Sequence, residues 1–139
     1  MQLRLLTSFE QELAISYAKV VAVSVDPVEV NAAFRAGLNA KFPILSDAER
    51  TVQAELDMLE PTDPRHRPYL PFDFVLYPDL TIYKIYNGYY FWGRATLDDL
   101  RQDFRQISSE IRRDWDPFNL PEDILEGARQ RAAELAKEG

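Results

Sequence analysis

The sequence predicts an α/β protein in which helices pack in layers against a small sheet. Two observations lead to this prediction. Residues 20–25 form a nearly continuous run of apolar, mostly β-branched side chains, which is typical of a buried strand. Residues 72–87 have the pattern of two strands joined by a short turn, and segments with helical spacing of apolar residues flank the strands. Helices layered on a sheet would bury both kinds of apolar surface.

The first predicted helix covers residues 2–18. Its apolar side chains recur at three- and four-residue steps and form one stripe, which consists of Leu3, Leu6, Phe9, Leu13 and Tyr17. No capping residue precedes this helix. The strand 20–25 follows, and its apolar composition predicts that both of its faces are covered.

A second helix is predicted directly after this strand. Asp26, Pro27 and Glu29 have the spacing of a capping box with proline at the first helical position. The helix runs for about ten residues in this prediction. Val30 and Phe34 are expected on its inner face, packed against the rest of the protein.

Another helix start lies at the end of the segment "FPILSD", residues 42–47. Ser46 is the expected N-cap, and Glu49 lies three residues later. The helix that begins there should end near Met58. The proline-rich segment 60–71, "EPTDPRHRPYLP", then predicts a long surface loop.

A hairpin and two helices complete the predicted order. Pro78 and Asp79 mark the tight turn of the hairpin. Thr96 and Asp99 have capping-box spacing for a helix whose apolar stripe continues to about residue 113. A weaker, charged helix is predicted over residues 121–137.

The composition excludes several classes of function. The chain has 139 residues, 23 acidic against 16 basic, and a net charge of −7, which argues against a nucleic-acid or anionic-membrane partner. It contains no cysteine, so neither a disulfide framework nor a thiolate metal site can form within these residues. No apolar run reaches the length of about 20 residues that a membrane helix needs. A cytoplasmic location is the resulting expectation.

Three segments together resemble the peroxiredoxin-like redoxins of the alkyl hydroperoxide reductase and thiol-specific antioxidant (AhpC/TSA) family. They are "VVAVSVD", "FPILSD" and "LPFDFVLYPDLTI", in this order and at family-like spacing. The resemblance implies a thioredoxin-like, peroxiredoxin-type three-layer sandwich that lacks its first strand and carries an extra C-terminal helix. It also implies a redoxin domain over residues 1–115 and a helical tail over residues 116–139.

The same resemblance implies a chemistry and a special proline. The family's catalytic cysteine stands at the amino end of the first helix, where its thiolate attacks a peroxide O–O bond or a disulfide. In this sequence that place lies just before Gln2, and no other residue replaces the thiol. The family also implies a cis-proline at the start of the strand facing that cysteine, a place that Pro71 occupies.

Other candidate sites are weaker. Asp57, Glu60, Asp63 and His66 recur every three residues, but two prolines exclude a helix there, so a solvated acidic stretch is favoured over a metal site. No nucleotide-binding glycine loop is present, and no cofactor is expected. A possible interaction surface remains in four consecutive aromatic residues, although core packing explains them as well: Tyr89, Tyr90, Phe91 and Trp92.

Three interpretations of function stay open. The leading one is a peroxiredoxin-like domain that is catalytically silent because it has no cysteine. One alternative is a non-enzymatic domain that forms homo-oligomers or binds another protein through its incomplete sheet edge. The other is an amino-terminally truncated form of an active thiol peroxidase, and it predicts that the reading frame continues upstream through an apolar strand to a cysteine.

Overall fold

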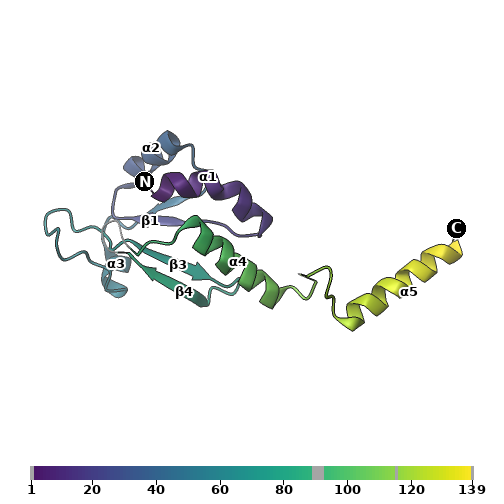
Figure 1. The fold of residues 1–139 in the computed structure, drawn as a ribbon. Coiled ribbons are helices and arrows are strands. Elements are labelled where there is room, and N and C mark those ends of the chain that lie inside the picture. Colours follow the sequence, from purple (N-terminus) through teal and green to yellow (C-terminus); the bar gives the residue numbers. More distant parts are fainter. Residues whose placement is uncertain (1, 89–92, 115, 139) are drawn as a thin grey trace. The chain divides into compact units, whose positions relative to one another are not determined.

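The computed structural model describes residues 2–88, 93–114 and 116–138 (Figure 1). Within these ranges the chain forms five helices and four strands. In order they are α1 (Gln2–Ile15), β1 (Ala22–Ser24), α2 (Val28–Leu38), β2 (Ile44–Ser46), α3 (Thr51–Glu55), β3 (Phe72–Leu76), β4 (Ile82–Asn87), α4 (Leu97–Ile111) and α5 (Glu122–Glu138). The predicted helices, first strand and hairpin occur in the predicted order, but β2, which lies between α2 and α3, was not predicted.

The chain divides into two compact units, Met1–Arg101 and Gln102–Gly139. The division falls inside α4, so it does not test the predicted boundary at residue 115, which stays a prediction. In the second unit Arg113 donates a 2.7 Å hydrogen bond to Asp123. Asp116 accepts hydrogen bonds from the Phe118 backbone and the Asn119 side chain, which stabilises the turn before α5.

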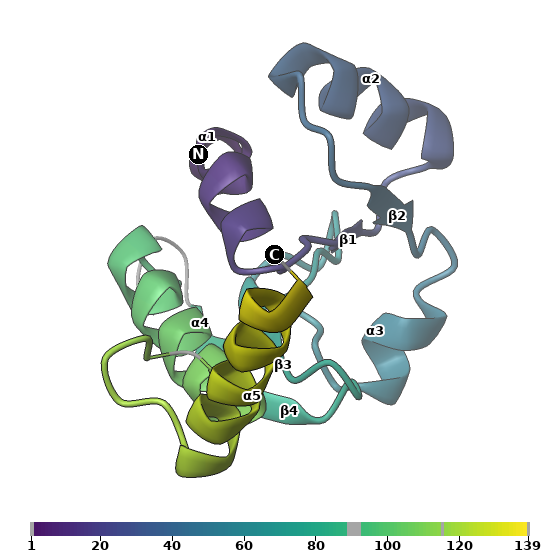
Figure 2. The same ribbon diagram turned by 90° about the vertical axis from the view of Figure 1, so that its right-hand side faces the viewer.

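The four strands form two separate pairs (Figure 1, Figure 2). β1 and β2 are parallel, with Ala22 opposite Ile44 and Ser24 opposite Ser46. β3 and β4 are antiparallel and have a register shift between Val75 and Leu76. In the part of the chain that the structure describes, each strand therefore has one paired edge.

The predicted turn of the hairpin is confirmed. Leu80 N donates to Tyr77 O at 2.9 Å, and Tyr77 N donates to Thr81 O at 2.8 Å, so Pro78 and Asp79 lie at the tip. The Asp79 carboxylate accepts a hydrogen bond from Thr81 N. This local network closes the two strands on each other.

Helix α1 has the predicted apolar stripe over most of its length. Leu6, Phe9 and Leu13 are buried. Tyr17, however, lies beyond the end of the helix, is 83% exposed and has a positive φ of 54°. The helix ends there because Ala18 N donates to Leu13 O, a contact that closes the last turn.

The face of α2 that contacts the sheet differs from the prediction. Val30 and Phe34 are about half exposed, whereas Asn31 is 3% exposed. The Asn31 side chain accepts a hydrogen bond from the Ser24 hydroxyl and donates to the carbonyls of Asp26 and Leu45. These three polar contacts turn the Asn31 face toward β1 and β2, and the apolar residues therefore point elsewhere.

Two predicted helix caps are wrong and one is confirmed. Pro27 occupies the N-cap of α2 without a side-chain hydrogen bond, so the predicted capping box is not formed. Ser46 belongs to β2, and the carboxylate of Asp47 receives the hydrogen bonds at the start of α3. At α4 the Thr96–Asp99 box is present, because Asp99 N donates to Thr96 Oγ1 and Thr96 N donates to Asp99 Oδ2.

The strand predicted over residues 20–25 is shorter and more exposed than its composition indicates. β1 contains three residues, and Val23 is 48% exposed. Among the described residues β1 has a neighbouring strand on one side only, so less of the surrounding structure covers it than would cover a central strand.

Candidate functional site

Polar groups from three parts of the chain meet at the start of α1. The Gln2 side-chain amide donates a 2.6 Å hydrogen bond to Oδ2 of Asp73 in β3. The backbone N–H of Ala95 donates to the same oxygen at 3.0 Å. Asp73 thus joins the first turn of α1 to the segment that precedes α4.

Arg94 adds a positive charge to this region. It precedes Ala95 in the sequence, and its Nε atom is buried without a hydrogen-bond partner in the part of the chain that the structure describes. A buried donor that makes no hydrogen bond costs about 1–3 kcal/mol. An anion placed within reach of this guanidinium would remove that cost.

The start of α1 has the same electrostatic preference. The first N–H groups of a helix have no partner within the helix, and together with the helix dipole they favour negative charge. The first turn of α1 contains no acidic residue. The nearby carboxylate is that of Asp73, whose Oδ2 is engaged by Gln2 and Ala95.

The peptide bond before Pro71 is trans, since the described residues contain no cis peptide bond. The predicted cis-proline at this position is therefore corrected. The segment before Pro71 is held extended, because Leu70 N donates to Met58 O at 2.7 Å and Glu60 N donates to Pro68 O at 3.0 Å. A Leu59–Tyr69 bridge lies between these contacts, and an extended segment of this kind accommodates the more stable trans bond.

Asp47 and Tyr69 stabilise the same segment. The Tyr69 hydroxyl donates a 2.6 Å hydrogen bond to Oδ2 of Asp47, which also accepts the N–H groups of Val52 and Gln53. The Tyr69 bond is the main cause that lowers the pKa of Asp47, and the N–H groups add to it. Burial and the neighbouring carboxylate raise the pKa of Tyr69.

The remaining sequence-based candidates do not form a site. His66 Nδ1 lies 2.8 Å from Asp63 Oδ2, while Glu60 accepts hydrogen bonds from Thr62. No group of three or more potential metal ligands occurs among the described residues. The aromatic residues proposed as an interaction surface, Tyr89, Tyr90, Phe91 and Trp92, lie outside the described residues.

A family model for the AhpC/TSA family matches residues 1–85, more than half of the chain. The chain belongs to the AhpC/TSA family. No curated protein matches it. The family assignment predicted from the three sequence segments is confirmed.

Solved structures of similar fold show that this AhpC/TSA chain is thioredoxin-like. AhpC from Mycobacterium tuberculosis is 19% identical with a TM-score of 0.61, covering 78% of this chain and 62% of its own. The peroxidoxin BcpB from Mycobacterium tuberculosis is 22% identical with a TM-score of 0.60, covering 77% and 66%. AhpC from Enterococcus faecalis is 18% identical with a TM-score of 0.62, covering 76% and 64%. The chain therefore spans about two thirds or less of these proteins.

Sequence reasoning located the start of α1 but missed two residues beside it. Asp73 interrupts the apolar strand "FDFVL", and a partly buried carboxylate needs hydrogen-bond donors. Arg94 follows a glycine with a positive φ of 76°, which marks a sharp turn. A charged residue within an apolar strand and an arginine after a turn glycine are signals that can be searched for.

None of the helices in the described ranges combines the length and the apolar character needed to span a membrane.

Proposed function

We propose that these 139 residues supply the framework of an AhpC/TSA redoxin domain and do not catalyse peroxide reduction by themselves. The main observation is the site at the start of α1. Asp73 and the unpartnered Arg94 donor lie where an anion would be stabilised, yet the sequence contains no cysteine.

The chemistry of the family requires a sulfur nucleophile. A thiolate attacks one oxygen of the peroxide, the O–O bond breaks, and the sulfur becomes a sulfenic acid while the alcohol or water leaves. The two methionines of this chain cannot replace the thiol, since oxidation of a thioether yields a sulfoxide and no disulfide. The site therefore provides electrostatic stabilisation without the attacking group.

A peroxide-consumption assay tests this proposal. The purified chain is mixed with hydrogen peroxide or an alkyl peroxide and a dithiol reductant, and peroxide is followed over many equivalents. We expect a rate equal to that of heat-denatured protein. Sustained turnover above this control would overturn the proposal.

A second candidate function is association through the unpaired sheet edges. β1 and β3 each lack a second neighbour among the described residues. Apolar side chains in these strands or directly before them are 39–57% exposed: Val21, Val23, Phe74 and Leu76. An exposed edge of this kind readily pairs with another strand. A homo-oligomer or a protein partner that adds a strand would cover it.

Sedimentation at high micromolar concentration tests association, and a lysine on the edge strand tests its location. Val23→Lys places a charge on β1 and should reduce the oligomer, whereas Val28→Lys on the exposed start of α2 should leave it unchanged. A monomeric mass for the unmodified chain would contradict this function. The aromatic run 89–92 stays a prediction for the same role, and a cytoplasmic location stays one that cell fractionation can check.

A further inference from the structure

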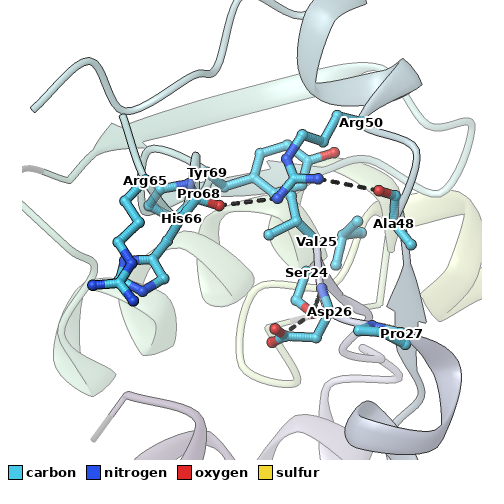
Figure 3. A pocket seen from close by; sticks show the side chains of 11 residues that line it. Ser24, Val25, Asp26, Pro27, Ala48, Arg50, Arg65, His66, Pro68 and Tyr69 are labelled. Carbon is cyan, nitrogen blue, oxygen red and sulfur yellow. Dashed lines mark hydrogen bonds between the residues drawn. The ribbon is translucent and has the colours of Figure 1, made fainter. Parts of the chain in front are cut away.

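An open pocket of about 600 Å³ lies at the carboxyl end of β1 (Figure 3), and neither Gln2, Asp73 nor Arg94 lines it. Its wall comes from three separate stretches of the first unit, which are residues 23–27, 48–50 and 65–69. This volume is within the range of about 300–1,000 Å³ that is typical of small-molecule sites. The pocket is therefore large enough for a small organic ligand.

Arg50 holds the walls of the pocket together. It has a positive φ of 60°, and its guanidinium donates hydrogen bonds to the carbonyls of Ala48, His66 and Arg67. The Gln53 side chain donates a 2.9 Å hydrogen bond to the Arg67 carbonyl as well. These contacts fix the segment around residues 65–69 against the start of α3, so the pocket is preformed.

The opposite wall is fixed equally well. The Asp26 carbonyl accepts hydrogen bonds from the Ser46 hydroxyl at 2.6 Å and from the Asn31 side chain at 3.3 Å. Asp26 N donates to Ser24 Oγ at 3.1 Å. The turn that presents the Asp26 carboxylate therefore has few alternative conformations.

Besides Arg50, whose guanidinium donates to three backbone carbonyls, two side chains of opposite charge line the pocket without an ion-pair partner among the described residues. Figure 3 shows the Asp26 carboxylate on one side and the Arg65 guanidinium on the other. Among the described residues, the Asp26 carboxylate has the Ser24 hydroxyl as its side-chain partner at 3.3 Å, and the Arg65 guanidinium has neither a hydrogen bond nor an ion pair. Val23, Val25 and Pro68 provide apolar surface along the same pocket.

We propose that this pocket binds a short zwitterion, with an ammonium group at Asp26, a carboxylate at Arg65 and an apolar chain between them. Such a molecule matches both unpaired charges and the apolar lining at once. A ligand with a negative charge alone would give the Asp26 carboxylate no ion-pair partner. A ligand with a positive charge alone would give the Arg65 guanidinium none. Dipeptides and ω-amino acids carry this arrangement of groups.

Three probes of nearly equal size test the proposal. 6-Aminohexanoate carries both charges, hexanoate carries the carboxylate alone and hexylamine carries the ammonium alone. Binding is followed on the unmodified chain through NMR shifts of the amides of residues 23–26 and 65–69. We expect 6-aminohexanoate to bind more tightly than either single-charge probe, by up to about five-fold, because one additional exposed ion pair contributes up to about 1 kcal/mol.

Two variants and two controls locate the charges. Asp26→Asn and Arg65→Gln should each weaken 6-aminohexanoate binding to the level of the single-charge probes. Asp57→Asn and Arg105→Gln change exposed residues of the same types outside the pocket and should leave binding unchanged. NMR spectra of the free variants check that each is folded.

Several outcomes would overturn the proposal. One is equal binding of hexanoate and 6-aminohexanoate, which would reduce the pocket to an anion site. Another is equal binding by the unmodified chain and the Asp26→Asn variant. A third is the absence of a saturable change in NMR chemical shift at tens of millimolar 6-aminohexanoate, which would mean that the pocket binds no zwitterion of this length.

Discussion

The two strand pairs of this protein differ in how they are stabilised. The β3–β4 hairpin joins strands of five and six residues through a turn whose hydrogen bonds lie within a few positions in sequence. The β1–β2 pair joins three-residue parallel strands that are separated by a helix. Parallel strands need a long crossover and contacts with surrounding elements, whereas a hairpin forms locally. The hairpin should therefore resist perturbation elsewhere, and the parallel pair should depend on its surroundings.

The largest effect is expected where the hairpin meets the segment before it. A Cβ added at Gly88 would overlap the backbone carbonyl of Pro71. Because backbone atoms cannot move aside as a flexible side chain can, Gly88→Ala should destabilise the protein by about 3 kcal/mol, near the upper end of the usual cost of overpacking. Chemical denaturation measures the change in the free energy of unfolding. A decrease below about 1 kcal/mol would show that the Pro71 backbone moves aside easily.

Asp47 follows β2 and connects it to the segment around Tyr69. Asp47→Asn should lower the melting temperature by several degrees at neutral pH, since it weakens three hydrogen bonds at one carboxylate. The folded-state pKa of Asp47 lies below its ordinary value of 3.8. Its contribution is therefore complete above the unfolded pKa and is lost as the pH falls through the folded pKa.

Thermal unfolding of both proteins across the acidic range checks this prediction. The difference between the unmodified chain and Asp47→Asn should be constant from neutral pH down to about pH 5. It should shrink as the pH falls further. A difference that grows with acidification would contradict the assigned role of the carboxylate.

Glu10 supports the parallel pair from α1. Its carboxylate accepts hydrogen bonds from Lys41 N and Phe42 N just before β2. Glu10→Gln replaces charge-assisted acceptors by one neutral oxygen and should cost about 1 kcal/mol. Amide hydrogen exchange should become faster by a larger factor at residues 44–46 of β2 than at residues 72–76 of β3. Equal changes in both strands would contradict the claim that the parallel pair depends more on its surroundings than the hairpin does.

The smallest expected effect has the opposite sign. Gly37 lies near the end of α2, and among the described residues no atom outside the adjoining turns of this helix lies within 4 Å of the place where a Cβ would be added. Gly37→Ala should stabilise the protein by about 0.5–1 kcal/mol because alanine has the higher helix propensity. Chemical denaturation measures this alongside Gly88→Ala, and a destabilising Gly37→Ala would show that this part of α2 has a neighbour.

Much of the architecture was predictable because its signals are local. Apolar spacing predicted α1 and α4, the Thr96–Asp99 box predicted the start of α4, and Pro78–Asp79 predicted the hairpin turn. The absence of cysteine likewise follows from the sequence alone. Each of these depends on residues no more than a few positions apart, where side-chain and backbone preferences are strong.

The tertiary structure decided which groups meet over long sequence separations. Asn31 is buried although its neighbours on α2 are apolar, because its side-chain amide hydrogen-bonds Ser24 of β1 and Leu45 of β2. Asp73 and Ala95 meet Gln2 across most of the chain. The segment before Pro71 pairs with residues 58–60, which precede it by a whole loop. Hydrogen bonds of this kind depend on three-dimensional proximity, so local patterns cannot predict them.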